Sequence, residues 1–184
     1  MEILKASTRK DNSGKSARRA RRSGSIPGIL YGYKKSNCLF EIGELELNKE
    51  LFQKGEHSIL NIAIDGENHK ALIKEVQRDP VNHKIIHIDL EELTHNKPII
   101  AQIPINYIGE ENLTAQGAVI QREKNNVRVS CSPENLPKYI NFNLKNAVVG
   151  NVFTIADLEV AEEISIVEDF EAVIASISLE QKVE

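Results

Sequence analysis

The chain has 184 residues, of which 41% are hydrophobic and 27% charged, and its formal net charge is −4. This composition is typical of a folded globular protein and argues against disorder over the whole chain. No apolar run approaches the roughly 18–20 residues that cross a bilayer, so no membrane association is expected. Cys38 and Cys131 lie far apart and outside any metal-ligand spacing, which indicates reduced thiols in a reducing compartment and no metal site. No cofactor is expected.

Positive charge is concentrated at the amino terminus. Ten of the 23 lysines and arginines, Lys34 and Lys35 among them, fall in the first 35 residues, where only Glu2 and Asp11 oppose them. That stretch carries a net +8, which leaves −12 for residues 36–184. One electropositive face on an acidic protein predicts a polyanionic partner, most naturally nucleic acid. The alternatives are a solubilising tail and an organellar transit peptide, which is also rich in arginine and serine.

In chain order, the first half is predicted to form short strands with two helical segments. Residues 2–8 alternate like a strand, residues 11–15 form a turn or flexible arm, and residues 17–22 wind into one or two helical turns that end at Gly24. Pro27 then directs the chain into the extended segment that follows. Further strands are expected at residues 29–33, 37–42, 59–64, 70–77 and 85–90, with Asp65 and Gly66 forming a hairpin turn.

A short helix is predicted at residues 48–54. Asn48 is a suitable N-cap, Leu51 and Phe52 supply a buried side, and Gly55 stands where a left-handed residue ends a helix.

The polar segment 92–98 is the predicted domain boundary, because it is polar and closes with a proline. It divides the chain into residues 1–93 and residues 94–184. The second part is again mostly strand, so the fold class is mainly β, with two β-rich domains of which the first carries short helices. The strands expected in the second domain are residues 99–108, 127–131, 139–144, 152–155, 164–167 and 172–177.

The amino-terminal arginines favour RNA over DNA. Four of them (Arg18, Arg19, Arg21 and Arg22) fall within five residues, a density that indicates phosphate binding. No helix-turn-helix, basic zipper or zinc finger is present to enter a DNA major groove. The aromatic signature of an RNA-recognition motif is missing as well. A β-rich domain that reads the shape of an RNA minor groove is therefore expected.

Specific motifs carry a family resemblance. Residues 18–24 (RRARRSG), 26–32 (IPGILYG), 76–80 (VQRDP) and 87–89 (HID), in this order and spacing, resemble the bacterial large-subunit family of 5S rRNA binders that includes the CTC general stress proteins. The resemblance covers nearly the whole chain and is to the long, two-domain form. It continues more loosely in the second half, at residues 117–121, 131–137, 150–153 and 156–158.

This resemblance implies a small amino-terminal β-barrel, similar to the anticodon-binding domains of some aminoacyl-tRNA synthetases, docked on an internal-loop helix of 5S rRNA. It also implies a structural role in the large subunit, in ribosome assembly and translation, for a cytoplasmic protein that is monomeric off the ribosome. The residues that match the family's RNA contacts are Arg9, Lys15, Arg18, Arg19, Arg21, Tyr31, Gln77, His87 and Asp89.

The chemistry of the strand at residues 85–90 fits RNA reading. A period of two places Ile86, Ile88 and Leu90 on one face and His87 with Asp89 on the other. An acidic group on an RNA-binding surface is expected to accept hydrogen bonds from base amino groups, while a histidine donates or stacks. Without the resemblance, an exposed polar strand face is the alternative.

Tyr31 and Gln77 complete the set of reading residues. Gln77 can both donate and accept. Tyr31 offers a ring and a hydroxyl that can reach a 2′-hydroxyl, although packing in the barrel is the simpler role for this residue taken alone.

Two other functions compete with this interpretation. Catalysis by His87 and Asp89 finds no support, because no nucleophile elbow, P-loop, zincin or dinucleotide motif is present. A stress-induced RNA-binding or protein-interaction module that acts off the ribosome would carry the same basic arm.

Residues 144–184 form a separate case, since they contain nine acidic residues against two lysines. Such a surface is expected to contact a basic ribosomal protein or to face solvent, unless the acids serve only solubility.

Overall fold

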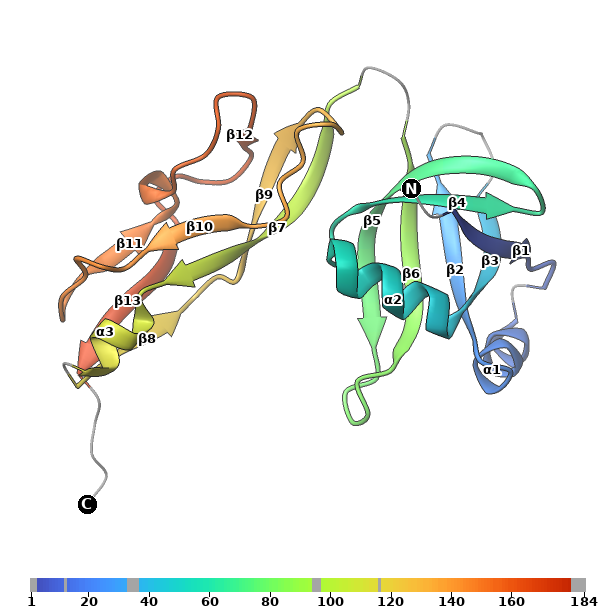
Figure 1. The fold of residues 1–184 in the computed structure, drawn as a ribbon, viewed down its shortest axis with the longest axis horizontal. Coiled ribbons are helices and arrows are strands. Elements are labelled where there is room, and N and C mark those ends of the chain that lie inside the picture. Colours follow the sequence, from blue (N-terminus) through green and yellow to red (C-terminus); the bar gives the residue numbers. More distant parts are fainter. Residues whose placement is uncertain (1–2, 12, 33–36, 94–96, 116, 180–184) are drawn as a thin grey trace. The chain divides into compact units, whose positions relative to one another are not determined.

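The computed structural model describes residues 3–11, 13–32, 37–93, 97–115 and 117–179. The chain divides into two compact units, Met1–Ile99 and Ile100–Glu184 (Figure 1). Both consist mainly of strands with a few short helices, which confirms the predicted fold class.

The first unit is a closed barrel of six strands in the order β1-β3-β2-β6-β5-β4. Strand β1 closes it, because it pairs antiparallel with β3 on one side and parallel with β4 on the other. A second parallel pair joins β2 to β6, and the remaining pairs are antiparallel. The strands are β1 (Leu4–Thr8), β2 (Ser25–Tyr31), β3 (Cys38–Gly43), β4 (Ile59–Ile64), β5 (Glu67–Arg78) and β6 (Ile85–Glu92).

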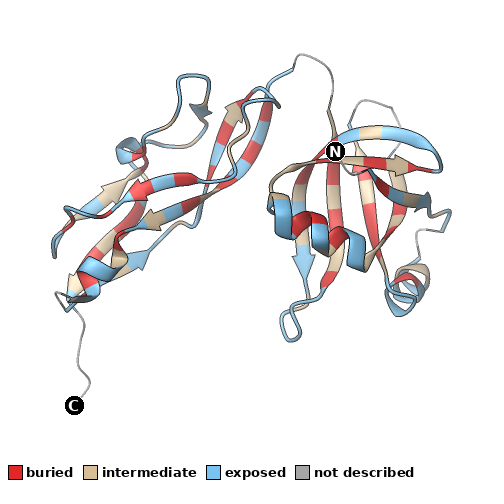
Figure 2. Ribbon diagram, viewed as in Figure 1, coloured by how far each residue is buried: buried red, intermediate tan, exposed pale blue. Residues whose placement is uncertain are grey.

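Alternating apolar side chains fill the barrel, and the buried positions recur along each strand (Figure 2). Gly28 is required at the centre of β2, since a Cβ there would lie 2.4 Å from Cζ of Phe40 and 2.8 Å from Cγ2 of Ile88. The predicted hairpin between β4 and β5 is confirmed. Asp65 and Gly66 both have positive φ, of 50° and 92°, as a two-residue turn of this type needs.

Two helices accompany the barrel. Helix α1 (Gly14–Arg22) begins three residues earlier than predicted, and α2 (Glu44–Lys54) closes the end of the barrel at which β3 finishes and β4 begins. The prediction that α2 starts at Asn48 is wrong, because Gly43 is its N-cap. The C-terminal glycine is as expected, with Gly55 at φ 91°.

The buried side of α2 also differs from the prediction. Leu47 and Leu51, four residues apart, pack into the barrel, whereas Phe52 is 94% exposed. The reason is that one residue rotates the helix by about 100°, so Leu51 and Phe52 cannot share a narrow buried face. Glu50 is buried and forms an ion pair with Lys54.

The second unit contains a four-stranded sheet of order β10-β7-β9-β12 and a three-stranded sheet of order β11-β13-β8. Helix α3 and strand β8 lie in a stretch for which no element was predicted, because each is only five or six residues long. The elements are β7 (Ile99–Ile108), α3 (Glu110–Ala115), β8 (Ala118–Arg122), β9 (Asn126–Cys131), β10 (Ile140–Asn143), β11 (Val152–Thr154), the 3-10 helix η1 (Ile155–Asp157), β12 (Ser165–Ile166) and β13 (Val173–Leu179).

Both cysteines are free thiols; Cys131 is buried and Cys38 is half-buried. In the part of the chain that the structure describes, no helix is long and apolar enough to cross a membrane.

Candidate nucleic-acid interface

Helix α1 presents most of the predicted cations on one face. Ser13 caps it by accepting a hydrogen bond from the backbone N–H of Ser16, and buried Ala20 turns the opposite side toward the protein. Its basic last turn also suits the negative end of the helix dipole. The spacing i, i+3, i+4 and i+7 places four exposed side chains together on the outer face: Lys15, Arg18, Arg19 and Arg22.

Arg21 lies to one side of this face and has a structural contact. Its Nε donates a hydrogen bond of 2.8 Å to the backbone carbonyl oxygen of Ile86 in β6. The bond attaches the basic helix to the strand that carries His87 and Asp89. Two groups of predicted residues that are far apart in the sequence are therefore brought together.

Arg9 and Arg19 line a common cavity of about 370 Å³ between the end of β1 and α1. The Nε of Arg9 is buried and has no hydrogen-bond partner among the residues described. Lys10 lines the same cavity, as do Asp11 and Glu41. The sequence prediction missed Lys10, although its place beside Arg9 in the basic run was a usable signal.

The outward face of β2, β6 and β5 collects the remaining candidates. Gln77 lies opposite His87, and Asp89 has Glu75 on one side and Ile29 on the other. The prediction for the inner face is partly wrong: Ile88 and Leu90 are buried, but Ile85 rather than Ile86 is the third buried residue. A shift of register opposite Gln77 and Arg78 breaks the strict period of two at this point.

His87 and Asp89 form a close pair on this face. Nδ1 of His87 lies 2.6 Å from Oδ1 of Asp89, and their side chains are 25% and 27% exposed. The contact is short enough for an ion pair, but its angle is not that of a hydrogen bond, so Asp89 Oδ1 has no hydrogen-bond donor in the described part of the chain. Oδ1 itself is buried under His87, so an incoming N–H group would be accepted by the part of the carboxyl group that remains exposed.

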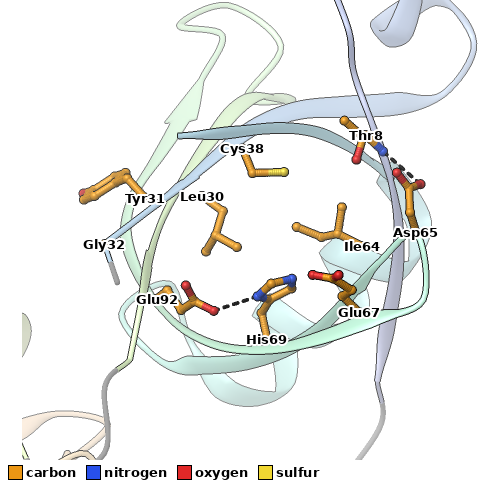
Figure 3. Close-up of a pocket in the computed structure, with 10 residues that line it drawn as sticks. All are labelled: Thr8, Leu30, Tyr31, Gly32, Cys38, Ile64, Asp65, Glu67, His69 and Glu92. Atoms are coloured by element: carbon orange, nitrogen blue, oxygen red, sulfur yellow. Dashed lines mark hydrogen bonds and ion pairs between the residues drawn. The ribbon is translucent and has the colours of Figure 1, made fainter. Parts of the chain in front are cut away.

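Tyr31 stands next to Glu91 on the same face, and in Figure 3 its ring points away from the cavity at the end of the barrel. Burial, and then the nearby carboxylates of Glu91, Asp89 and Glu75, raise the pKa of its hydroxyl. Tyr31 is therefore a neutral donor near pH 7. Glu75 and Glu91 were not among the predicted site residues, and only the strand register reveals that they adjoin Asp89.

The end of the barrel opposite α2 holds a different cavity, of about 340 Å³ (Figure 3). Leu30, Cys38 and Ile64 line its apolar part, and Nδ1 of His69 lies 2.7 Å from Oε1 of Glu92. Asp65 and Glu67 add further carboxylates, so this end repels a polyanion. Among the described residues, no group of three or more acidic, histidine or cysteine side chains could hold a metal ion.

The predicted site residues thus form two neighbouring groups. The first is a cationic group on α1 and the arm before it; the second is a polar group on β2, β5 and β6, joined to the first through Arg21. The predicted basic residues Lys34 and Lys35, and the end of the predicted strand at Tyr33, lie outside the described residues.

Comparison with known proteins finds matches for both halves of the chain. Residues 4–90 match the model of the ribosomal L25p family, and residues 98–181 match that of the C-terminal domain of ribosomal protein TL5. The large ribosomal subunit protein bL25 of Clostridium perfringens is 45% identical over 100% of this chain and 91% of its own length. The bL25 proteins of Bacillus licheniformis and Geobacillus thermodenitrificans are 33% and 31% identical, over 100% and 95% of this chain and 88% and 83% of their own lengths.

These matches define a two-domain protein of a ribosomal class, and not an enzyme. The chain belongs to the ribosomal L25p family, in the long form that carries the TL5-type second domain.

Proposed function

We propose that this chain is a structural protein of the large ribosomal subunit, located with the ribosome in the cytoplasm, and that residues 1–93 form a 5S rRNA-binding domain. The observation that carries the proposal is the cationic face of α1, fixed by Arg21 beside the polar face of β2, β6 and β5. The names of its relatives support the ribosomal part of the proposal.

The two groups of residues have different roles in this proposal. Lys15, Arg18 and Arg19 neutralise phosphates and position the protein, which gives affinity without sequence information. Gln77, His87 and Asp89 read exposed base edges, and Tyr31 reaches a 2′-hydroxyl. Asp89 opposes phosphate attraction, so its place beside the cations is best explained by a hydrogen bond accepted from a base amino group.

In the same proposal, residues 94–184 form the second domain of the protein, and the acidic part of this domain binds a basic ribosomal protein. The support lies in the segment between β12 and β13, where Phe170 is 55% exposed between Asp169 and Glu171. An exposed aromatic ring with carboxylates around it suits the aliphatic stems and charged ends of lysine and arginine.

Competition between RNAs tests the first domain. The full chain should shift 5S rRNA in a gel at physiological salt, tRNA in large excess should not displace it, and the protein should co-sediment with large subunits. An Arg18→Ala/Arg19→Ala variant is the matched control and should bind both RNAs poorly. Equal binding of tRNA and 5S rRNA by the wild-type chain would overturn the proposal, and absence from large subunits would favour the role off the ribosome.

A further inference from the structure

The outward side of the four-stranded sheet in the second unit has an unusual composition. The inward residues of β7, β9 and β10 are buried in alternation, and the outward positions carry five exposed amides. We call this surface the amide face; its amides are Gln102, Asn106, Asn126, Asn141 and Asn143.

No carboxylate stands at an outward position of these three strands, although residues 100–184 contain thirteen acidic residues against six basic ones. The cation of the face is Arg128, whose Nε lies 3.4 Å from Oε1 of Glu168. The amide face is therefore close to neutral, whereas nine of the thirteen acids follow residue 150. A polyanion can approach this face without the repulsion that the rest of the unit would exert.

The amides are also oriented. Nδ2 of Asn106 donates a hydrogen bond of 2.9 Å to Oδ1 of Asn141, and the two residues lie opposite each other in the parallel pair of β7 and β10. Each amide has two donor hydrogens and two acceptor lone pairs, so the pair keeps both donor and acceptor capacity for a ligand. Immediately before β10, the ring of Tyr139 is 53% exposed.

This combination suits the minor groove of an RNA helix better than a protein surface. That groove is wide and shallow and displays 2′-hydroxyls and base edges, which both donate and accept hydrogen bonds. A basic protein would instead be drawn to the acidic segments, and an apolar protein would need a larger continuous apolar patch.

We propose that the amide face is a second RNA-contact surface, which binds a ribosomal RNA helix through hydrogen bonds rather than through ion pairs with phosphates. The inference rests on the proposed function, because a neutral face binds weakly by itself. Once the first domain is bound, the amide face is held near ribosomal RNA at high effective concentration, so a weak contact becomes occupied.

Photo-crosslinking of the full chain tests the proposal. The crosslinking amino acid p-benzoylphenylalanine replaces Asn141 in one variant and Gln121 in another, and each is bound to a mixture of 5S and 23S rRNA and to large subunits that lack the protein. Gln121 is a matched control, because it is an exposed amide of the same unit but lies on β8 of the other sheet. A third variant carries the crosslinker at Tyr31 in the first domain.

The proposal predicts RNA crosslinks from position 141 and none from position 121. A protein product alone from position 141, or equal RNA yields from both positions, would overturn it. If position 31 crosslinks to 5S rRNA while position 141 gives no RNA product, this inference alone is wrong. If neither position 31 nor position 141 gives an RNA crosslink, the proposed function is wrong as well.

Affinity gives a second measurement. The Asn106→Ala/Asn141→Ala variant should bind the rRNA mixture about fivefold to thirtyfold more weakly, with no change in the salt dependence, because no charge is removed. Gln121→Ala should bind as the wild type does. An unchanged affinity of the double variant would contradict the proposal.

Discussion

Nε of Arg21 and the carbonyl oxygen of Ile86 are joined by a hydrogen bond, although the two residues are 65 positions apart in the chain. Together with the burial of Ala20, this bond holds the cations of α1 at a defined distance from the polar residues of β6. An RNA helix that contacts both groups therefore meets them at a fixed spacing, and that spacing is itself a source of selectivity for folded RNA.

Arg21→Lys should separate this positioning role from charge. Lysine keeps the positive charge but lacks the Nε donor, so 5S rRNA affinity should fall by about 0.5–1.5 kcal/mol at an unchanged salt slope. Arg22→Lys is the control, because Arg22 lies on the exposed face of α1. Gel-shift titrations at several salt concentrations measure both quantities, and equal losses in the two variants would contradict the role assigned to Arg21.

Arg19→Ala should remove a phosphate contact. We expect binding to 5S rRNA to weaken by about 1–3 kcal/mol. The slope of log K against log salt should also become shallower by about 0.7–0.9. The same titrations measure this slope, and a loss of affinity with no change in slope would show that Arg19 does not contact a phosphate.

Asp89→Ala should also weaken 5S rRNA binding by about 1–3 kcal/mol, but it should leave the slope of log K against log salt nearly unchanged. The reason is that, in the proposed function, Asp89 accepts a hydrogen bond from a base and releases no counterion. Tighter binding by this variant would mean that the carboxylate only repels RNA. Equal slope changes for Arg19→Ala and Asp89→Ala would refute the division into positioning and reading residues.

Gly28→Ala should destabilise the barrel by about 1–3 kcal/mol, because the added methyl group would overlap Phe40 and Ile88 in a closed core. Urea unfolding measures the loss as a lower midpoint. Gly14→Ala is the control, since a Cβ at Gly14 meets no atom within 4 Å and its backbone is helical, and it should be neutral or slightly stabilising. Equal midpoints for the two variants would show that the barrel relaxes around the methyl group.

Glu168 should make the second unit sensitive to acid. Burial by itself would raise the pKa of this carboxyl group, but hydrogen bonds from Lys124 and from the backbone N–H of Arg128 outweigh it, so the pKa lies below its ordinary value of 4.5. Because its pKa is lower in the folded state, the ionised Glu168 stabilises the folded protein, and this contribution is complete above about pH 4.5. It is lost as the pH falls through the folded-state pKa.

Glu168→Gln tests this link. The variant should be less stable than the wild type by about 1–3 kcal/mol at pH 7, and the difference should shrink as the pH falls below 4.5. Thermal unfolding of both proteins from pH 7 to pH 3 measures it. Glu171→Gln, which changes an exposed carboxylate three residues away, is the control and should cost little. A constant difference across the pH range would exclude the ionised carboxylate as its cause.

The sequence was sufficient to locate the strands of the barrel and the basic helix, because both depend on local patterns, although β2 begins at Ser25, four residues before the predicted strand. Ile59–Ile64 alternates, Asp65 and Gly66 are typical of a two-residue hairpin turn, and the arginines of α1 repeat at helical spacing. The start of α2 could not be found in this way. Gly43 has no side chain with which to cap it, while Asn48 looks like a better cap from the sequence.

The contents of the site depended on pairing between strands, which no local pattern encodes. The neighbours of Asp89 come from β2 and β5, so Glu75 could not be placed beside it before the register was known. The shift of register opposite Gln77 and Arg78 likewise could not be foreseen, and it places Ile85 in the core instead of Ile86. Periodicity identifies the face on which a side chain lies, but not the strand beside it.

The closure of the barrel has a consequence for synthesis of the protein. Strand β1 pairs with β4, and β2 pairs with β6. The barrel therefore cannot finish folding until about residue 91 has emerged from the ribosome that is translating the chain. From then on it needs nothing from the residues still to be translated, because domains usually fold as units from the amino terminus onward. Under the proposed function, a nascent chain would therefore be able to bind 5S rRNA before the acidic second half has been made.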